Sequence, residues 1–262
     1  MATIQLKTNR LTGAQSPLWG MSKRFLYLMA AFIAAAMTLA SCVESDENEG
    51  NENGENGGGS SVSGKRIKSW VQETSRPSDY VRVEYTYNSD GSFKQADQYD
   101  ATGHYTKSVY TNNSDGTPNK IDQSFVRDAT LKNVSEFTYT NKTLKSVNLV
   151  LYTNGVVTTT GKIDYTFVNG KKTLEVQTNQ GGAVTIERAF EYDSNGKRTG
   201  MTETQKVNGN IIGTRKYTRS YKDGLLHTVT FPWGPYDPTP VTMTVTWENG
   251  KKTVDEDIFL AL

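Results

Sequence analysis

Hydrophobic and polar residues alternate with a period of two along much of the chain after residue 80. Val81, Val83, Tyr85 and Tyr87 are separated by polar residues, and the polar positions between them are Arg82, Glu84 and Thr86. Successive side chains of a β-strand point to opposite faces, so this pattern predicts a strand with one apolar and one polar face. It recurs in Ile163, Tyr165 and Phe167, in Ile186, Phe190 and Tyr192 with Arg188 interrupting, and in Val241, Met243, Val245 and Trp247.

Turn residues divide these strands at regular intervals of about 26 residues. Asn-Gly and Asp-Gly pairs supply the positive φ angles that tight hairpins require. The first set of turn glycines is Gly91, Gly116, Gly170, Gly196, Gly224 and Gly250, with Asn141-Lys142 in the remaining position. A second set lies about midway between them, at Thr102-Gly103, Asp128-Ala129, Asn154-Gly155, Gly181-Gly182 and Asn208-Gly209. Each repeat thus predicts a hairpin of two strands.

The fold class that follows is all-β, an antiparallel meander of about 14 strands between Lys65 and Phe259. A sheet with this many strands curls, splits or closes. A circular barrel of that size is too wide for its own side chains to fill. We therefore expect a closed barrel or a strongly curled sheet that either flattens into two packed layers or keeps a cavity. Val241, Met243, Val245 and Trp247 are expected in its core.

The N-terminal region has the layout of an export signal. Lys23 and Arg24 precede an uncharged apolar run from Phe25 to Met37, which is too short to cross a bilayer as a helix. The sequence Leu-Ala-Ser-Cys at 39–42 resembles the lipobox of bacterial lipoproteins. That resemblance implies a diacylglycerol on the sulfur of Cys42, cleavage before it, and acylation of the new amino terminus. Cys42 is the only cysteine, so no disulfide is expected.

The boundaries divide the chain into three parts. Residues 1–41 are the leader and signal peptide, and Met21 is the expected true start because residues 1–20 hold no apolar run. Residues 42–63 are the lipidated cysteine and an acidic, glycine-rich tether, which cannot bury apolar surface and is expected to be extended. Residues 64–262 are the β-repeat domain. The acidic residues after Cys42 resemble the surface-export signal of lipoproteins in Gram-negative gut anaerobes, which implies an outer-membrane protein facing the cell exterior.

The repeats carry a second resemblance. The phrases "YDSNGKRT" (192–199) and "YDATGHYT" (99–106) resemble the YD repeats of large β-shell proteins. The longer period and the lipoprotein leader are more similar to a family of lipoproteins of unknown function that is described as having a porin-like fold. The likeness covers residues 65–262. It implies a porin-like barrel and carries no functional residues.

Charge and candidate chemistry exclude several classes of function. Without residues 1–42, 25 of the 29 basic residues and all 28 acidic residues remain, because the removed part contains Lys7, Arg10, Lys23 and Arg24 and no acidic residue. That balance does not suggest nucleic acid as a partner. His104 and His227 lie far apart and form no metal motif, and no cofactor or catalytic motif appears. The aspartates at the turns are explained by turn chemistry: Asp90, Asp100, Asp115, Asp193 and Asp223.

The stretch "FPWGPYDPTP" (231–240) interrupts the repeat with four prolines and three aromatic residues. Prolines fix φ angles and would hold Trp233 and Tyr236 in place. Rigid exposed aromatic residues bind sugars and proteins at little entropic cost. The alternative is that the two rings cap the end of the sheet.

These observations predict a protein of the cell envelope that binds rather than catalyses. Its partners would be the membrane, through the lipid on Cys42, and a glycan or an envelope or host protein. One alternative is a hydrolase acting on polysaccharide, which would need two carboxylates about 5 to 10 Å apart in a cleft. Another is a small transmembrane β-barrel, which strands of about 10 residues would allow. The lipid anchor and the basic residues on a Tyr-rich apolar face count against that second alternative.

Overall fold

The computed structural model describes residues 64–75, 77–234 and 237–250. The alternating segments form fourteen strands, and the described residues add one helical turn, η1 (Pro77–Asp79). The strands are β1 (Gly64–Glu73), β2 (Val81–Tyr87), β3 (Phe93–Asp100), β4 (Gly103–Asn112), β5 (Pro118–Phe125), β6 (Leu131–Thr140), β7 (Thr143–Thr153), β8 (Val156–Val168), β9 (Lys171–Asn179), β10 (Val184–Tyr192), β11 (Arg198–Val207), β12 (Asn210–Lys222), β13 (Leu225–Pro232) and β14 (Pro240–Gly250).

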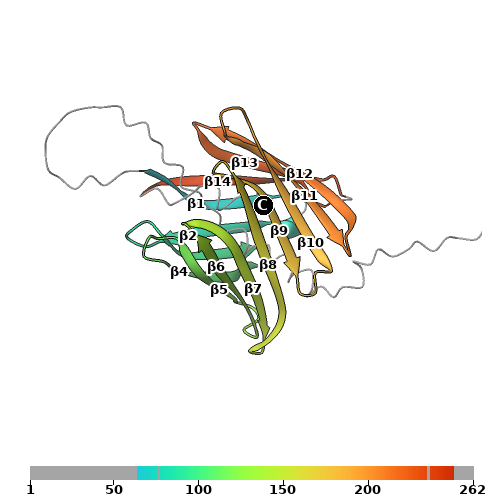
Figure 1. Cartoon of the computed structure of the whole chain (residues 1–262). Helices are drawn as coiled ribbons and strands as arrows, with labels where there is room; N and C mark the ends of the chain where they lie inside the picture. The colour runs from blue at the N-terminus through green and yellow to red at the C-terminus, as the bar shows by residue number, and fades with distance from the viewer. Residues whose placement is uncertain (1–63, 76, 235–236, 251–262) are drawn as a thin grey trace, which may run out of the picture.

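Every strand pairs with its neighbours in sequence, and β1 pairs with β14 to close the barrel. In Figure 1 the red β14 lies beside the blue-green β1. The closing ladder runs from Gly64 opposite Gly250 to Glu73 opposite Thr242, and all pairs are antiparallel. The predicted all-β meander of about 14 strands is therefore confirmed, and of the two expected outcomes the sheet takes the closed barrel.

The apolar faces of the strands point into the barrel and fill it. Val147 on β7, Ile163 on β8 and Met243 on β14 are each 0% exposed. They belong to one hydrophobic cluster with members on nearly every strand, among them the predicted Val241 and Val245, while Trp247 packs against it. A circular barrel of fourteen strands could not be filled in this way. We infer that the barrel is flattened, so that its walls pack on each other.

The outward positions of the same strands are polar. On β14 the residues between the buried ones are Thr242, Thr244 and Thr246, and on β2 they are Arg82 and Glu84. The large apolar residues that are exposed are scattered over several strands and turns: Val109, Val126, Val156, Val157, Val168 and Ile211. A barrel that spans a bilayer needs the reverse arrangement, with an outward apolar band about 25 Å tall. No described helix is long and apolar enough to cross a membrane.

The turns use the chemistry that the sequence predicts. Asp90, for example, accepts hydrogen bonds from the backbone N–H and the hydroxyl of Ser92, at 2.8 and 2.7 Å. Asp223 instead takes a positive φ of 52°, as turn aspartates tolerate. Aspartates that accept a backbone hydrogen bond in the same way are Asp100, Asp115, Asp128, Asp193 and Asp237.

A repeated side-chain bond joins strand pairs at the barrel end that carries the first set of turn glycines, which includes Gly196 and Gly224. We call the gap between an odd strand and the next even strand at this end a seam, because the ladder stops short there. In the β9–β10 seam the ladder ends at the pair Leu174–Ala189. Tyr192, three residues beyond Ala189, donates its hydroxyl to the carbonyl of Lys172, at 2.8 Å. We call this bond a clamp.

The same offsets recur around the barrel. The clamp donor lies three residues beyond the end of the ladder on the even strand, and the acceptor lies two residues before its start on the odd strand. The other clamps are Tyr87 to Ile67, Asn112 to Phe93, Tyr139 to Pro118, Tyr221 to Arg198 and Trp247 to Leu226. Next to each clamp donor, a register shift lies in the ladder that joins the even strand to its other neighbour. A β-bulge of this kind changes the direction in which a side chain points.

Candidate functional site

Two of the three predicted site residues lie outside the described residues. Cys42, with the leader and tether around it, precedes Gly64, and Tyr236 falls in the gap at 235–236. Lipidation of Cys42 and contact through Tyr236 therefore stay predictions. Only Trp233 can be placed.

Trp233 follows β13 at the barrel end opposite the clamps. Its side chain is half-buried and packs against the hydrophobic cluster. Its backbone N–H donates to the carbonyl of Thr239 at 2.8 Å, and its own carbonyl accepts from the Arg215 guanidinium at 3.3 Å. Trp233 is thus held from both sides. This geometry favours the end-cap alternative for the indole, with one part of the ring left accessible.

The sequence did not predict a network of charged side chains inside the barrel. Arg188 on β10 lies between two glutamates, Glu175 on the neighbouring β9 and Glu203 on the neighbouring β11. Its Nη1 donates to Glu175, and its Nε donates to Glu203 at 3.0 Å. The three residues are between 1% and 2% exposed. They form a salt-bridged row across three strands.

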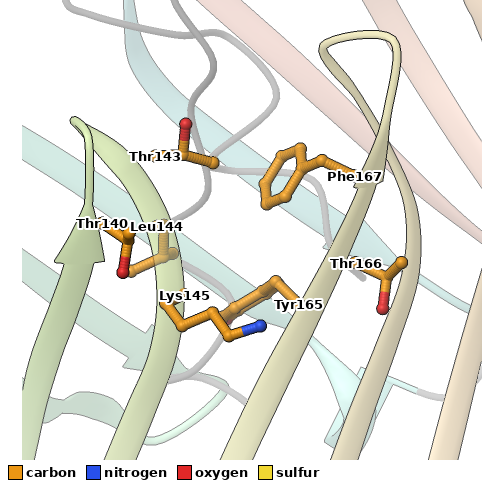
Figure 2. A pocket seen from close by; sticks show the side chains of 7 residues that line it. All are labelled: Thr140, Thr143, Leu144, Lys145, Tyr165, Thr166 and Phe167. Carbon is orange, nitrogen blue, oxygen red and sulfur yellow. The ribbon is translucent and has the colours of Figure 1, made fainter.

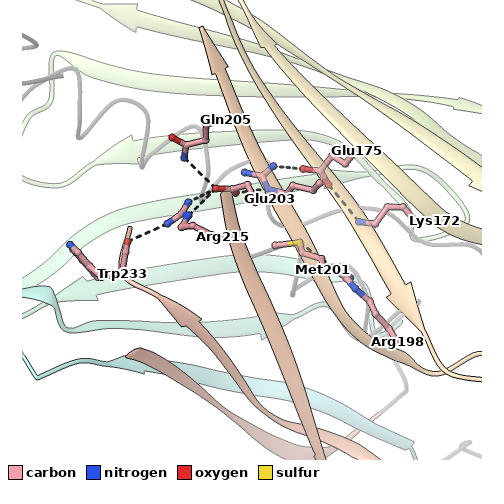
Figure 3. A network of polar contacts seen from close by, with 9 residues as sticks. Lys172, Glu175, Arg198, Met201, Glu203, Gln205, Arg215 and Trp233 are labelled. Carbon is pink, nitrogen blue, oxygen red and sulfur yellow. Dashed lines mark hydrogen bonds and ion pairs between the residues drawn. The ribbon is translucent and has the colours of Figure 1, made fainter. Parts of the chain in front are cut away.

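Further basic residues extend this row at both ends. Arg215 on β12 donates twice to Glu203, and one of these bonds, from Nε, is 3.0 Å long. Lys172 lies 3.6 Å from the other glutamate, Glu175. Figure 3 shows Arg215 between Glu203 and the carbonyl of Trp233, which connects the network to the loop after β13. We call Lys172, Glu175, Arg188, Glu203 and Arg215 the lumen network.

The charges of this network support one another. Burial opposes ionisation of Glu203, but Arg188 and Arg215 outweigh it and hold the pKa of this carboxyl below its usual value. Burial likewise disfavours the charge on Arg188, yet the two glutamates raise the pKa of its guanidinium. Two basic groups lie over the Phe190 ring: the Lys172 amine is 4.4 Å and the Arg198 guanidinium 4.0 Å from the ring centroid. Such cation–π contacts stabilise the basic groups in an apolar surrounding.

This arrangement does not suit hydrolysis of a polysaccharide. A glycosidase pair needs one carboxyl that stays protonated as an acid and a second that faces a water or the sugar. Here both glutamates are ion-paired and almost fully buried, and the pKa of Glu203 is lowered rather than raised. The lumen network joins strands through paired, buried carboxylates.

A hollow of about 240 Å³ opens at the seam between β7 and β8. Its lining combines three threonines, an amine and two aromatic rings: Thr140, Thr143, Leu144, Lys145, Tyr165, Thr166 and Phe167. In Figure 2 the Phe167 ring projects from β8 toward Thr143, and the Lys145 amine points across the gap. Nothing in the alternation pattern distinguishes this seam from the others, so the hollow could not be predicted from that pattern.

The histidines do not form a site, in keeping with their separation in the sequence. His104 stacks on Tyr99 with ring centroids 5.0 Å apart, and its Nε2 lies 3.2 Å from Asp97 on the outer surface. His227 is exposed on β13. Within residues 64–75, 77–234 and 237–250, no group of three or more His, Cys, Asp or Glu side chains could hold a metal ion.

Comparisons with known proteins find likenesses among solved structures. No family model matches the chain, and no curated protein matches it. Among solved structures, a porin-like protein from Bacteroides uniformis ATCC 8492 is 12% identical, with a TM-score of 0.36. The likeness covers 70% of this chain and 98% of that one.

Proposed function

We propose that this protein is a lipid-anchored component of the cell envelope that acts without catalysis, by contacting a glycan or another protein. The observation that carries the proposal is the distribution of side chains between the two faces of the barrel. The lumen is filled by packed apolar residues and the lumen network, and the outward strand positions are polar. A filled barrel cannot conduct solutes, so its outer surface and its loops are the parts available for function.

The two alternatives fit these features less well. A transmembrane barrel would place the polar outward residues in hydrocarbon, where an Arg or Lys side chain costs about 2–4 kcal/mol at the midplane. A hydrolase would need accessible carboxylates, whereas those of the lumen network are buried and paired. A non-enzymatic binding or structural protein is the function that remains best supported.

The anchor at Cys42 and display on the cell exterior rest on the sequence. The signal peptide, the lipobox and the acidic tether support a palmitate-bearing outer-membrane lipoprotein with the barrel outside the cell. Several acyl chains would hold it firmly, since each buried methylene contributes about 0.8 kcal/mol.

Labelled palmitate and protease shaving test this location. Wild-type protein expressed in its native envelope should incorporate the label, and the Cys42→Ala variant should not. Protease added to intact cells should remove the barrel domain. Equal labelling of Cys42→Ala would refute the anchor, and full protection from protease would refute display on the exterior.

Trp233 and Tyr236 are the proposed contact residues of the loop between β13 and β14. The half-buried position of Trp233 leaves room for a partner to touch its accessible part. Trp233→Ala should weaken binding of the protein to envelope or host material, and because the ring packs against the core it should lower the melting temperature, though less than Trp247→Ala does. Trp247→Ala is the matched control, because Trp247 packs against the core and donates to Leu226. If both variants melt equally early, Trp233 is an end cap and not a contact residue.

A further inference from the structure

One of the seven seams differs from the rest in having no side-chain donor at the clamp position. At the β7–β8 seam the ladder ends at the pair Ser146–Asp164. The offsets found at the other seams place the donor at residue 167 and the acceptor carbonyl at Leu144. Residue 167 is a phenylalanine, which has neither a hydroxyl nor an N–H in its side chain. The Leu144 carbonyl therefore lacks the bond that closes each of the other seams.

The hollow lies at this same place. Leu144 and Phe167, the two residues at the clamp positions, both line it. At three of the clamped seams a basic side chain also covers the tyrosine ring, as Lys171 covers Tyr192 at 5.6 Å. The residue at the corresponding place beside Phe167 is Thr143, which is shorter. The missing hydroxyl and the missing cover together leave space between β7 and β8.

The lining of the hollow has the chemistry of a sugar site. Phe167 offers an aromatic face, and Thr140, Thr143 and Thr166 offer hydroxyl groups. Lys145 makes no ion pair within the described residues, while Asp164 on β8 is already paired with Lys162 at 2.7 Å. The hollow thus carries one uncompensated positive charge, which favours an anionic ligand.

We propose that this hollow binds a single ring of an acidic sugar, such as a uronic acid at the end of a glycan. The inference rests on the proposed binding function and gives it a site and a ligand class. The apolar face of the ring packs on Phe167, and the carboxylate faces Lys145. A ring hydroxyl donates to the Leu144 carbonyl in place of the absent clamp. The volume of about 240 Å³ is below the range of pockets for larger ligands, which limits the bound part to one ring.

Saturation-transfer NMR on the purified full chain tests the proposal with three probes: glucuronate, glucose and acetate. Glucuronate should receive saturation at low millimolar concentration. Glucose, which lacks the carboxylate, should bind more weakly, and acetate, which lacks the ring, should show no transfer. Equal signals from glucose and glucuronate would overturn the acidic-sugar assignment, and no signal from glucuronate would overturn the site.

Three variants locate the binding. Phe167→Tyr supplies the missing hydroxyl, closes the seam and should abolish glucuronate binding. Tyr192→Phe, which opens a different seam, should leave binding unchanged. Lys145→Gln should weaken binding about threefold, which corresponds to an exposed ion pair, and it decides the question if Phe167→Tyr folds poorly.

The outcomes separate this site from the broader function. Glucuronate binding that is as strong in both Phe167→Tyr and Lys145→Gln as in the wild type places the ligand elsewhere on the barrel and overturns the site. If glucuronate does not bind but Cys42 is labelled and the barrel is shaved from intact cells, the envelope location stands and the sugar site falls.

Discussion

The two sides of the barrel lumen are built in different ways. Around β13, β14 and β1 the inward residues are apolar, and Val241 and Met243 are 0% exposed without any polar partner. Around β9, β10 and β11 the same inward positions hold Glu175, Arg188 and Glu203, which are just as deeply buried. Both regions are therefore core, but only one of them depends on ion pairs.

The difference shows that both apolar and ion-paired side chains can fill parts of a wide barrel. An apolar residue gains free energy simply by leaving water. A buried charge loses free energy unless a partner of opposite charge lies at hydrogen-bonding distance. The charged side of the lumen is thus more exacting, because each member of the row depends on its neighbours. Three predictions test this contrast, in order of decreasing effect.

Arg188→Met should destabilise the protein by about 3–5 kcal/mol, because it leaves Glu175 and Glu203 buried without their shared partner. The measurement is the free energy of unfolding in urea at neutral pH. Met243→Ala serves as the apolar comparison and should cost about 2–5 kcal/mol through the cavity it creates. If Arg188→Met unfolds with the same free energy as wild type, the lumen network contributes nothing to stability and the contrast fails.

Acid should weaken the charged side of the lumen selectively. The folded-state pKa of Glu203 lies below its unfolded value near 4.5. Its contribution is therefore fully present above pH 4.5 and is lost as the pH falls through the lower folded-state value. We expect the free energy of unfolding to fall over this window in wild type and in Met243→Ala. The decline should be smaller in Glu203→Gln, and an identical decline in that variant would contradict the assignment.

The clamps extend the comparison to the barrel end, where both sides of the lumen use the same bond. Tyr192→Phe on the charged side should cost about 1 kcal/mol, the usual net value of a hydrogen bond. Phe167→Tyr should gain a similar amount by adding the missing clamp. The measurement is the melting temperature of Tyr192→Phe and of Phe167→Tyr, each compared with the wild type. Opposite shifts support the clamp as a stabilising device, and two shifts of the same sign would contradict it.

Local patterns in the sequence were sufficient to predict the antiparallel meander, because period-two alternation and Asn-Gly turns act over a few residues. They left open whether the sheet closes into a barrel or stays curled. The strand count, the aspartate turns and the inward position of Met243 follow from them. The lumen network did not follow. Arg188 appeared only as a break in an apolar face, and Glu203 lies in a polar stretch, so their pairing depends on the register of three strands.

The clamps and the hollow were also beyond local reasoning. Tyr192 and Phe167 look alike as aromatic residues near the end of a strand. The carbonyl at the acceptor position of each seam, Lys172 or Leu144, is 20 or more residues earlier, and it becomes available only where a ladder stops. The consequence of the hydroxyl that Phe167 lacks therefore depends on the three-dimensional arrangement of the seams and cannot be found from the neighbouring residues alone.

Closure through β1 and β14 sets the order in which this protein can become stable. Arg66 and Glu248, paired at 2.8 Å across that ladder, are 182 residues apart in the chain. Contacts of such separation form slowly, and strands with unpaired edges associate with other chains in the meantime. A ribosome or an export machine that delivers the chain from its N-terminus leaves β1 with one bare edge until Pro240–Gly250 arrives. β14 therefore determines when the barrel can close, and its loss would leave a sheet with two unpaired edges that can associate with other chains.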